Sequence, residues 1–340
     1  PDTERREKLL NDNGFEFLGV GVSGGEEGAR HGCAIMIGGK PENYELVRPI
    51  FEAASAKVNG EPCAAHVGNG SAGHFVKMVH NGIEYGLMQL IAETYDIFKR
   101  CFEFEDSEIS DIFADWNESE LNSFLVEITA TVLHKKDSET GNNLVEMILD
   151  TAGQKGTGKW TSEVAMDMGV PIPTIDSAVT MRQISAMKKE RVTANEILGT
   201  NAIKAKDFRK LVKVKDLKGS LLASFIITYA QGLALLKTAS AEKNYEIDLT
   251  EVAKIWRGGC IIRAALLEDI RAAFAKNKDL SNLLLDEKFA DQMKEIWTDL
   301  LTVCVTAPTV AMPTMCLSAS LNYFNAYRTE RLPANLIQAQ

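Results

Sequence analysis

The sequence predicts a mainly α-helical protein in which a remnant of an α/β domain is followed by a large all-α domain. Two observations carry this prediction. Before about residue 70, short apolar runs of strand length occur around a single amphipathic helical pattern, whereas long helical patterns dominate after Gly73. The helical part also contains an internal duplication. We therefore expect one domain over 1–70 and a second over 71–340.

The first seventy residues contain enough strand signals for a piece of a sheet. Phe15–Val22 and Cys33–Ile37 read as short buried strands, Glu42–Val58 as an amphipathic helix and Cys63–Val67 as another short strand. This is too little sheet for a complete doubly wound domain.

The helical part repeats itself at an offset of 140 residues, because Glu108–Trp116 matches Asp248–Trp256. Each copy follows a long apolar helix. The segments with helical patterns are 74–101, 118–135, 219–241 and 261–275. A further stretch, Leu300–Tyr327, carries no charge, but prolines interrupt it, so we expect two buried helices around a kink and not a membrane span.

Composition narrows the classes of function. The chain has 340 residues and a net charge of -10, which argues against nucleic acid or an anionic membrane as the main partner. Its six cysteines are scattered and show no metal-ligand spacing with the histidines, so we expect reduced thiols, no bound metal and a cytoplasmic protein. The charged start does not resemble a secretory signal.

The segment Gly73–Gly86 is the strongest functional signal. Lys77, His80, Asn81 and Glu84 are spaced so that they lie on one face of a helix whose other residues are mostly apolar. Buried charges are costly unless they are paired or used, so this face suits acid/base chemistry better than a core. A surface ion pair between Lys77 and Glu84 is the alternative on pattern alone. The aligned helix of the second copy carries none of the four.

Three glycine-rich segments need weighing. Gly68–Gly73 satisfies GxGxxG, but no further strand follows it, so we expect a tight turn and a helix start. Gly153–Trp160 matches a P-loop except that Trp160 replaces the magnesium-binding Ser or Thr, and it could still cradle one phosphate. Ser23–Ala29 follows a predicted strand, where ligands bind in open α/β sheets.

Four motifs in order resemble the 6-phosphogluconate dehydrogenase family, namely Val22–Ala29, Gly73–Gly86, Lys155–Trp160 and Trp256–Arg263. The resemblance implies a Rossmann-like NADP-binding domain before an all-helical substrate-binding and dimerisation domain. It also implies oxidative decarboxylation of 6-phosphogluconate to ribulose 5-phosphate and CO2 in the pentose phosphate pathway, with NADP, without a metal and in a homodimer. NAD stays open, because the residues that read the ribose 2′ position are not found in this sequence.

The same resemblance implies roles for individual residues. Lys77 corresponds to the general base and Glu84 to the general acid. The residues matching those around the substrate carboxylate and hydroxyls are Ser23, Gly24, Gly25, His80 and Asn81, and those matching the phosphate site are Tyr85, Lys155, Thr157 and Arg182. A lysine with a pKa lowered by burial can accept a hydroxyl proton, and a carboxylic acid can protonate the resulting enediol carbon.

The resemblance also implies that the chain lacks most of the N-terminal cofactor domain and the C-terminal tail of the family. We therefore expect this polypeptide alone to lack NADP-dependent turnover. Two alternatives remain open at this point: a related β-hydroxyacid dehydrogenase acting on a non-phosphorylated acid, and a non-catalytic helical dimerisation scaffold.

Overall fold

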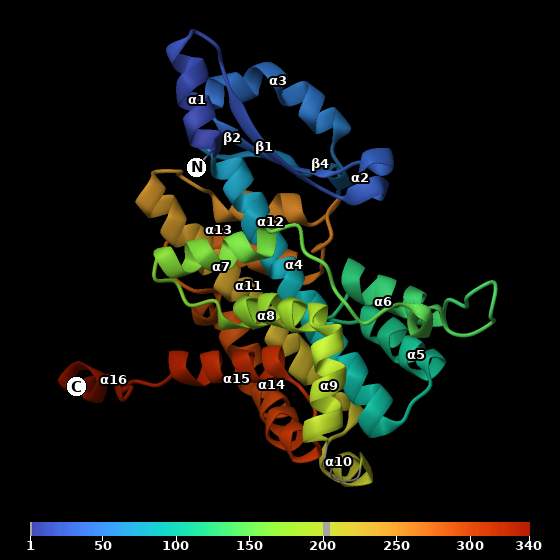
Figure 1. The fold of residues 1–340 in the computed structure, drawn as a ribbon. Helices are drawn as coiled ribbons and strands as arrows, with labels where there is room; N and C mark the ends of the chain where they lie inside the picture. The colour runs from blue at the N-terminus through green and yellow to red at the C-terminus, as the bar shows by residue number, and fades with distance from the viewer. Residues whose placement is uncertain (1, 200–204) are drawn as a thin grey trace.

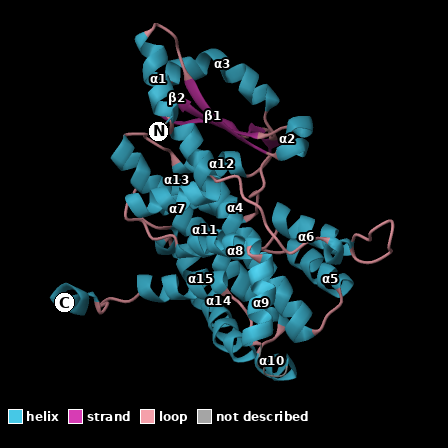
Figure 2. Cartoon of the chain, in the orientation of Figure 1, coloured by secondary structure: helices cyan, strands magenta, loops and turns pink. Residues whose placement is uncertain are grey.

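The N-terminal part is built on a small three-stranded sheet. A computed structural model describes residues 2–199 and 205–340, and Figure 2 shows its strands confined to one end of the molecule. The strand order is β1-β2-β5, with β1 (Leu18–Ser23), β2 (Ala34–Gly39) and β5 (Ala64–Gly68). The central strand β2 runs antiparallel to β1 and parallel to β5. Every residue of β2 is buried, as expected for a continuous apolar run in a central strand.

Helices cover both faces of this sheet (Figure 1). On one face α3 (Pro41–Ala54) packs its Tyr44 with Ile35 and Ile37 of β2. On the other face lie α4 (Ala72–Ile97) and α12 (Leu249–Trp256). The sheet is therefore held directly against the helical part of the molecule. The remaining N-terminal elements are α1 (Asp2–Asp12), α2 (Gly25–His31) and the two-stranded pair β3 (Lys57–Val58) and β4 (Glu61–Pro62).

The structure corrects the expected bounds in this part. The first strand begins only at Leu18, and the helix expected to reach Val58 ends at Ala54, because Ser55 is extended and pairs with Cys33. Part of the glycine turn after Ser23 is helical, since α2 starts at Gly25. The strands at 33–37 and 63–67 are confirmed, each shifted by one or two residues.

The rest of the described chain is helical. Its elements are α4, η1 (Phe98–Phe102, a π-helix), α5 (Asp106–Asn117), α6 (Phe124–His134), η2 (Leu144–Met147), α7 (Thr157–Asp167), α8 (Pro173–Ala186), α9 (Lys188–Leu198), α10 (Ala205–Leu211), α11 (Val214–Lys243), α12, α13 (Leu266–Lys276), η3 (Leu283–Leu285), α14 (Glu287–Thr306), η4 (Ala307–Val310), α15 (Met315–Tyr327) and α16 (Ala334–Ala339). A large sheet-free core follows from this order.

Two long helices form the centre of that core. Helices α4 and α11 pack side by side, and small residues bring them together: Gly232 lies under Ile83, and Gly86 lies against Thr228. Helix α11 is long and apolar enough to cross a membrane, yet 89% of its most apolar window is buried in the protein. Its length and composition are those of a core helix.

Two expected helices start later than their patterns suggest. The helix expected over 118–135 begins at Phe124, where the Ser123 side chain caps it by accepting from the Val126 N–H. The helix expected over 261–275 begins at Leu266. The residues before both helices pair with each other as an antiparallel bridge between Ser123 and Ala264 instead of forming helix.

The uncharged stretch Leu300–Tyr327 forms buried helices around a kink, as predicted. Helix α14 ends at Thr306, a 3-10 turn carries Pro308, and α15 begins at Met315.

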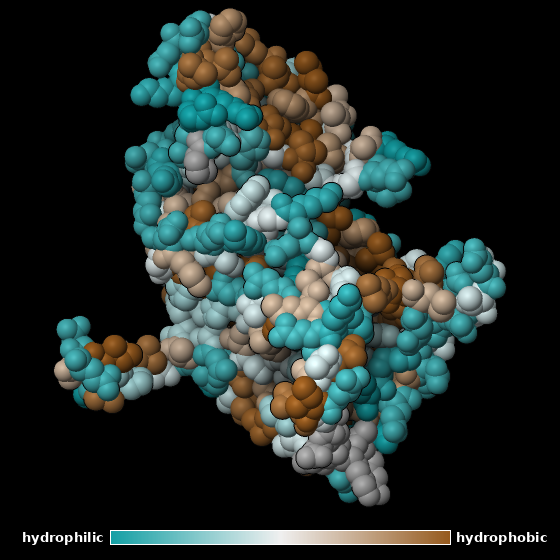
Figure 3. Space-filling view, viewed as in Figure 1, coloured by the Kyte–Doolittle hydropathy of each residue, from teal (hydrophilic) through white to brown (hydrophobic). Residues whose placement is uncertain are grey.

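Some apolar side chains of the protein are exposed. Figure 3 shows apolar surface over the N-terminal part, and Leu46 and Ile50 of α3 are largely exposed.

The GxGxxG segment is a tight turn and a helix start, as expected. A Cβ atom on Gly73 would lie 2.2 Å from the Gly19 carbonyl oxygen and 2.4 Å from that of Met36, so the first turn of α4 rests directly on the strands. A Cβ on Gly68 would lie 2.4 Å from the Tyr245 carbonyl oxygen. These two glycines therefore serve close backbone packing, Gly73 of α4 on the sheet and Gly68 of the turn on Tyr245.

We expect Gly73→Ala to destabilise the protein by about 2 kcal/mol, because the added methyl group forces α4 away from the backbone of two strands. The measurement is the free energy of unfolding in urea. Gly153→Ala is the matched control, since a Cβ there meets nothing within 4 Å. Equal stability of the two variants would contradict the close approach.

Candidate active site

The polar face predicted for α4 exists and is largely buried. The Lys77 Nζ lies 3.3 Å from His80 Nδ1, which lies 3.1 Å from the Asn81 Oδ1 and 3.8 Å from the Glu84 Oε2. His80 is fully buried, and the Glu84 side chain is 20% exposed. Two turns of helix therefore bring an amine, an imidazole, an amide and a carboxyl group together around His80, as the spacing predicted.

The end of β1 brings a fifth polar group to this face. The Ser23 Oγ lies 3.2 Å from His80 Nε2 and is itself buried. This approach needs small residues: a Cβ on Gly21 would lie 2.5 Å from the Lys77 Cβ, and one on Gly24 would lie 2.6 Å from the Gly259 carbonyl oxygen. Gly21 thus lets β1 lie directly against the polar face of α4, and Gly24 lets the strand end approach Gly259.

The His80 ring is held neutral. Burial lowers its pKa well below the usual range, and the neighbouring Lys77 charge lowers it further. Its Nδ1 can accept a hydrogen bond from Lys77 or donate one to Asn81, but not both at once. A hydrogen bond that Nδ1 accepts from Lys77 and one that it donates to Asn81 therefore need different tautomers of His80, and the 3.8 Å contact with Glu84 is not an ion pair.

Lys77 and Glu84 have pKa values shifted in opposite senses. Burial lowers the pKa of Lys77, against a smaller opposing effect of the Glu84 charge. Burial raises the pKa of Glu84, and Lys77 and Arg182 oppose that shift. Desolvation thus moves the amine toward its neutral form and the carboxyl toward its protonated form. These are the forms that a general base and a general acid need.

Three of the four predicted phosphate residues, Tyr85, Thr157 and Arg182, continue this face. The Asn81 Nδ2 donates to the Thr157 Oγ1 at 3.0 Å, at the start of α7. The Arg182 guanidinium lies 3.7 Å from the centroid of the Tyr85 ring, on the next turn of α4. A Cβ on Gly158 would lie 2.4 Å from the same ring, so α7 packs closely on Tyr85. Thr157, Tyr85 and Arg182 therefore belong to one continuous site with Lys77.

Two predicted residues stand apart from this network. Lys155 is exposed, and no hydrogen bond or ion pair of its side chain is found among the described residues. Gly25 is exposed at the first turn of α2 and contributes only backbone. Both lie close in the sequence to residues of the network, because Lys155 precedes Thr157 by two residues and Gly25 follows Ser23 by two.

Trp256, the first residue of the Trp256–Arg263 motif, contacts the site although the sequence pattern predicted no role for it. Its ring is fully buried and meets the His80 ring edge-on, with centroids 5.7 Å apart. Three residues on, Gly259 has a φ of 65° and its carbonyl accepts from the Ala34 N–H at 2.9 Å. The Trp-Arg-Gly-Gly motif therefore closes the site from behind, and the motif itself was the only signal of this role.

Other ligand chemistry finds less support. Within 2–199 and 205–340 there is no group of three or more His, Cys, Asp or Glu residues that could hold a metal ion. A hollow of about 430 Å³ lies between α11 and α12, but Lys237, Asp248 and Lys278 line it and no predicted site residue does. The largest group of predicted site residues therefore lies on α4.

A small α/β sheet leads directly into a helix with a buried lysine and glutamate, an arrangement that suits a dehydrogenase with a helical substrate domain. In agreement, residues 1–68 match the family profile "NAD binding domain of 6-phosphogluconate dehydrogenase", and residues 73–340 match "6-phosphogluconate dehydrogenase, C-terminal domain". The chain belongs to the 6-phosphogluconate dehydrogenase family.

Individual relatives agree with this assignment. The chain is 51% identical over its whole length to the NADP(+)-dependent decarboxylating 6-phosphogluconate dehydrogenase of Bacillus subtilis, of which it covers 72%. It is 49% identical to the decarboxylating 6-phosphogluconate dehydrogenase 1 of Saccharomyces cerevisiae, of which it covers 70%. A solved structure of Plasmodium falciparum 6-phosphogluconate dehydrogenase, studied in its apo form and with NADP+ or 6-phosphogluconate, superposes with a TM-score of 0.95 at 45% identity, covering 100% of this chain and 73% of that one.

Proposed function

We propose that the face of α4 around Lys77 is where 6-phosphogluconate is oxidised and decarboxylated. Because the chain belongs to this family, the reaction is the conversion of 6-phosphogluconate to ribulose 5-phosphate and CO2 with reduction of NADP. The observation that carries the placement is the buried pair of Lys77 and Glu84, whose pKa values are shifted in the senses that a base and an acid require.

In this proposal Lys77 is the general base. Its neutral amine takes the proton of the substrate hydroxyl as hydride leaves the same carbon, which gives a ketone β to the carboxylate. NADP, when bound, supplies the hydride acceptor. The resulting Lys77 ammonium then lies beside the new carbonyl oxygen, where its charge stabilises the enolate that forms when CO2 leaves. The buried setting strengthens that interaction.

Glu84 is the general acid of the second half. The carbon that has lost CO2 must be protonated, and a protonated carboxyl one helical turn from His80 is positioned to deliver that proton. Because burial raises the pKa of Glu84, it keeps its proton at higher pH than an exposed glutamate would.

The remaining predicted residues hold the substrate. Ser23, His80 and Asn81 supply hydroxyl, imidazole and amide groups for the carboxylate and hydroxyls, with backbone from Gly24 and Gly25. Tyr85, Lys155, Thr157 and Arg182 serve the phosphate. A guanidinium beside a helix start suits a phosphate monoester, because both donate hydrogen bonds to its oxygens.

We infer three further properties for the protein. The chain divides into domains over 1–70 and 71–340, as the boundary between the two family profiles near Gly68 and Gly73 supports. The helical domain carries an internal duplication, which is supported by the pairing of the equivalent segments at Ser123 and Ala264. The protein works in the cytoplasm as a homodimer, as its membership of the 6-phosphogluconate dehydrogenase family supports.

A direct test is the thermal stability of the protein with ligand. Because a ligand that binds only the folded state stabilises it, 6-phosphogluconate at a hundred times its dissociation constant should add about 2.7 kcal/mol to the free energy of unfolding. Gluconate at the same concentration should add much less. Equal shifts with both acids would favour a dehydrogenase of non-phosphorylated acids, and no shift with either would favour a non-catalytic scaffold.

A further inference from the structure

The loop over 149–156, which carries Lys155, is fastened to the corner between α8 and α9. No helix or strand is found within it, so its order must come from side-chain and backbone contacts. Three of its residues bond to side chains of this corner, and all three precede Lys155. They are Asp150, Ala152 and Gly153.

The first fastening is at Asp150. Arg191 donates through Nη1 to the Asp150 Oδ2 and through Nη2 to the Asp150 carbonyl oxygen, both at 3.1 Å. The Lys188 Nζ lies 2.7 Å from the other carboxylate oxygen. These contacts lower the pKa of Asp150, with the Lys188 hydrogen bond contributing the most among the lowering effects. Arg191 thus hydrogen-bonds to both the side chain and the backbone of one loop residue.

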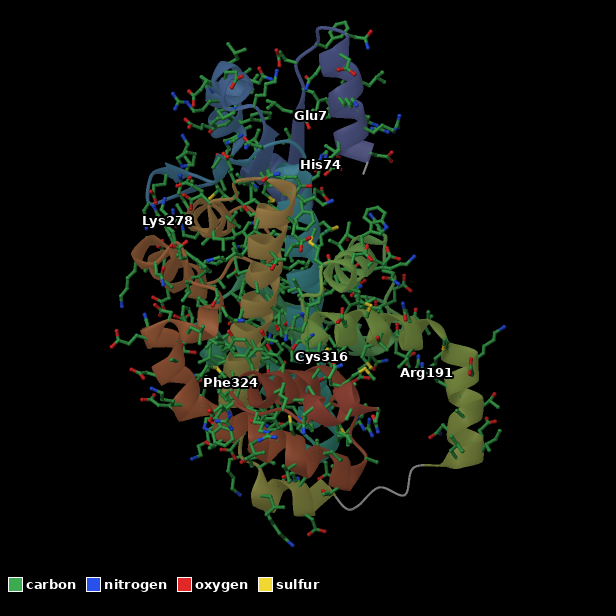
Figure 4. The ribbon with its side chains drawn as sticks, turned by 90° about the vertical axis from the view of Figure 1, so that its left-hand side faces the viewer. Glu7, His74, Arg191, Lys278, Cys316 and Phe324 are labelled. Atoms are coloured by element: carbon green, nitrogen blue, oxygen red, sulfur yellow. The ribbon has the colours of Figure 1, made fainter. Side chains whose placement is uncertain are left out.

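Arg191 also hydrogen-bonds to the end of α8. Its Nη2 donates to the Ser185 carbonyl oxygen at 3.1 Å, and the Ser185 hydroxyl accepts from the Ala152 N–H at 2.9 Å. One turn earlier, the Arg182 Nη1 donates to the Gly153 carbonyl oxygen at 2.7 Å. Figure 4 shows Arg191 at this corner of the molecule. Residues 150–153 of the loop therefore bond to the end of α8 and the start of α9, and Lys155 follows two residues after the last of these bonds.

This arrangement links the fastening to the phosphate end of the site. Arg182 both holds Gly153 and lies over the Tyr85 ring, while Thr157, just past the loop, accepts from Asn81. A free loop with two glycines would have to lose backbone freedom when Lys155 met a phosphate. A loop already fixed at 150–153 loses less, and preorganisation of this kind improves affinity.

We propose that Arg191 and Asp150 are positioning residues for the phosphate group of the substrate. They touch no substrate atom. They fix the 149–156 loop on the α8–α9 corner so that Lys155 is presented beside Arg182 and the start of α7. This inference rests on the proposed function and adds to it a residue pair on which selectivity for the phosphorylated substrate depends.

The test is a double-mutant cycle on the dissociation constant of 6-phosphogluconate, measured by calorimetry. We expect Arg191→Ala to weaken binding roughly tenfold and Lys155→Ala to weaken it by a similar factor. If Arg191 acts through the loop that presents Lys155, Arg191→Ala should have little further effect in the Lys155→Ala background. Arg191→Lys should recover part of the loss, because lysine reaches one of the acceptors.

The matched control is Arg209→Ala. Arg209 ties another loop in the same way, donating to the Phe102 carbonyl oxygen at 3.0 Å and pairing with Glu103 at 2.8 Å, and its side-chain exposure of 36% resembles the 32% of Arg191. Arg209→Ala should bind 6-phosphogluconate like the wild type. Asp150→Asn is a second, milder variant that should shift affinity in the same direction as Arg191→Ala.

The outcomes separate this inference from the proposed function. Unchanged affinity in Arg191→Ala, or factors from Arg191 and Lys155 that simply multiply, would overturn the positioning role alone. Absence of any 6-phosphogluconate binding by the wild type, or an unchanged affinity in Lys155→Ala, would overturn the phosphate assignment and this inference with it.

Discussion

Replacing Lys77 by methionine is expected to lower kcat about a thousandfold, since a positioned general base typically contributes a factor of 10² to 10⁴. Methionine keeps the length of the side chain and its contact with the apolar parts of α4, but it cannot accept the hydroxyl proton. The measurement is the rate of NADPH formation from 6-phosphogluconate by the protein as the cell makes it. Residual activity above a tenth of the wild type would show that another group is the base.

The stability of this variant distinguishes lost chemistry from lost structure. Because the folded-state pKa of Lys77 is lowered, the unfolded chain binds the proton more tightly, and wild-type stability rises as pH increases from the folded pKa toward 10.5. Lys77→Met should lose this rise and be no less stable at neutral pH. Lys159→Met, at an exposed lysine paired with Glu163, should change neither rate nor stability.

The pH dependence of kcat/KM follows from the same two groups. Activity should rise with pH as Lys77 loses its proton and fall as Glu84 loses its own, giving a bell-shaped profile. The two limbs belong to the coupled pair and not to either residue alone. Glu84→Gln should retain substrate binding, lower kcat and remove the falling limb.

The second large effect concerns Glu93, a buried carboxyl group outside the active site. Its oxygens accept from the Cys316 N–H at 2.9 Å and from the Leu317 N–H at 3.0 Å, at the start of α15. Figure 4 shows Cys316 among the packed helices. Near the far end of α4, Glu93 therefore satisfies two backbone donors that helix α15 cannot satisfy by itself.

Glu93→Ala should destabilise the protein by about 4 kcal/mol, because it leaves two buried N–H groups without acceptors and opens a cavity. The measurement is the free energy of unfolding in urea. Glu163→Ala, which removes an exposed helical glutamate, should cost less than about 1 kcal/mol. A similar loss in both variants would mean that water replaces Glu93 at α15.

The protonation of Glu93 adds a pH signature. Burial raises its pKa from 4.5 to about 7, against the smaller opposing effect of the two backbone hydrogen bonds. Since the folded-state pKa is the higher one, its contribution to stability is complete below 4.5 and is lost as pH rises through 7. Relative to Glu93→Gln, the wild type should lose about 3 kcal/mol over that window.

Much of the active site could be predicted because it is local in the sequence. Lys77, His80, Asn81 and Glu84 share a face through helical periodicity alone, and their partner Ser23 was found because the motif after the strand was itself recognisable. What periodicity did not give is the bounds of the helices. The helix expected from residue 118 begins six residues later, at Phe124, because the Ser123 cap and an antiparallel pairing compete with helix there.

The sequence by itself determined the order of the two parts, the shared face of Lys77, His80, Asn81 and Glu84, and the family to which the chain belongs. Only the tertiary structure decided the direction in which the pKa values of Lys77 and Glu84 shift, because a pKa depends on burial and on neighbours that are distant in the sequence. The structure also placed Trp256 against His80 and tied Arg191 to the loop of Lys155. Such contacts join separate elements, and no periodicity within one element encodes them.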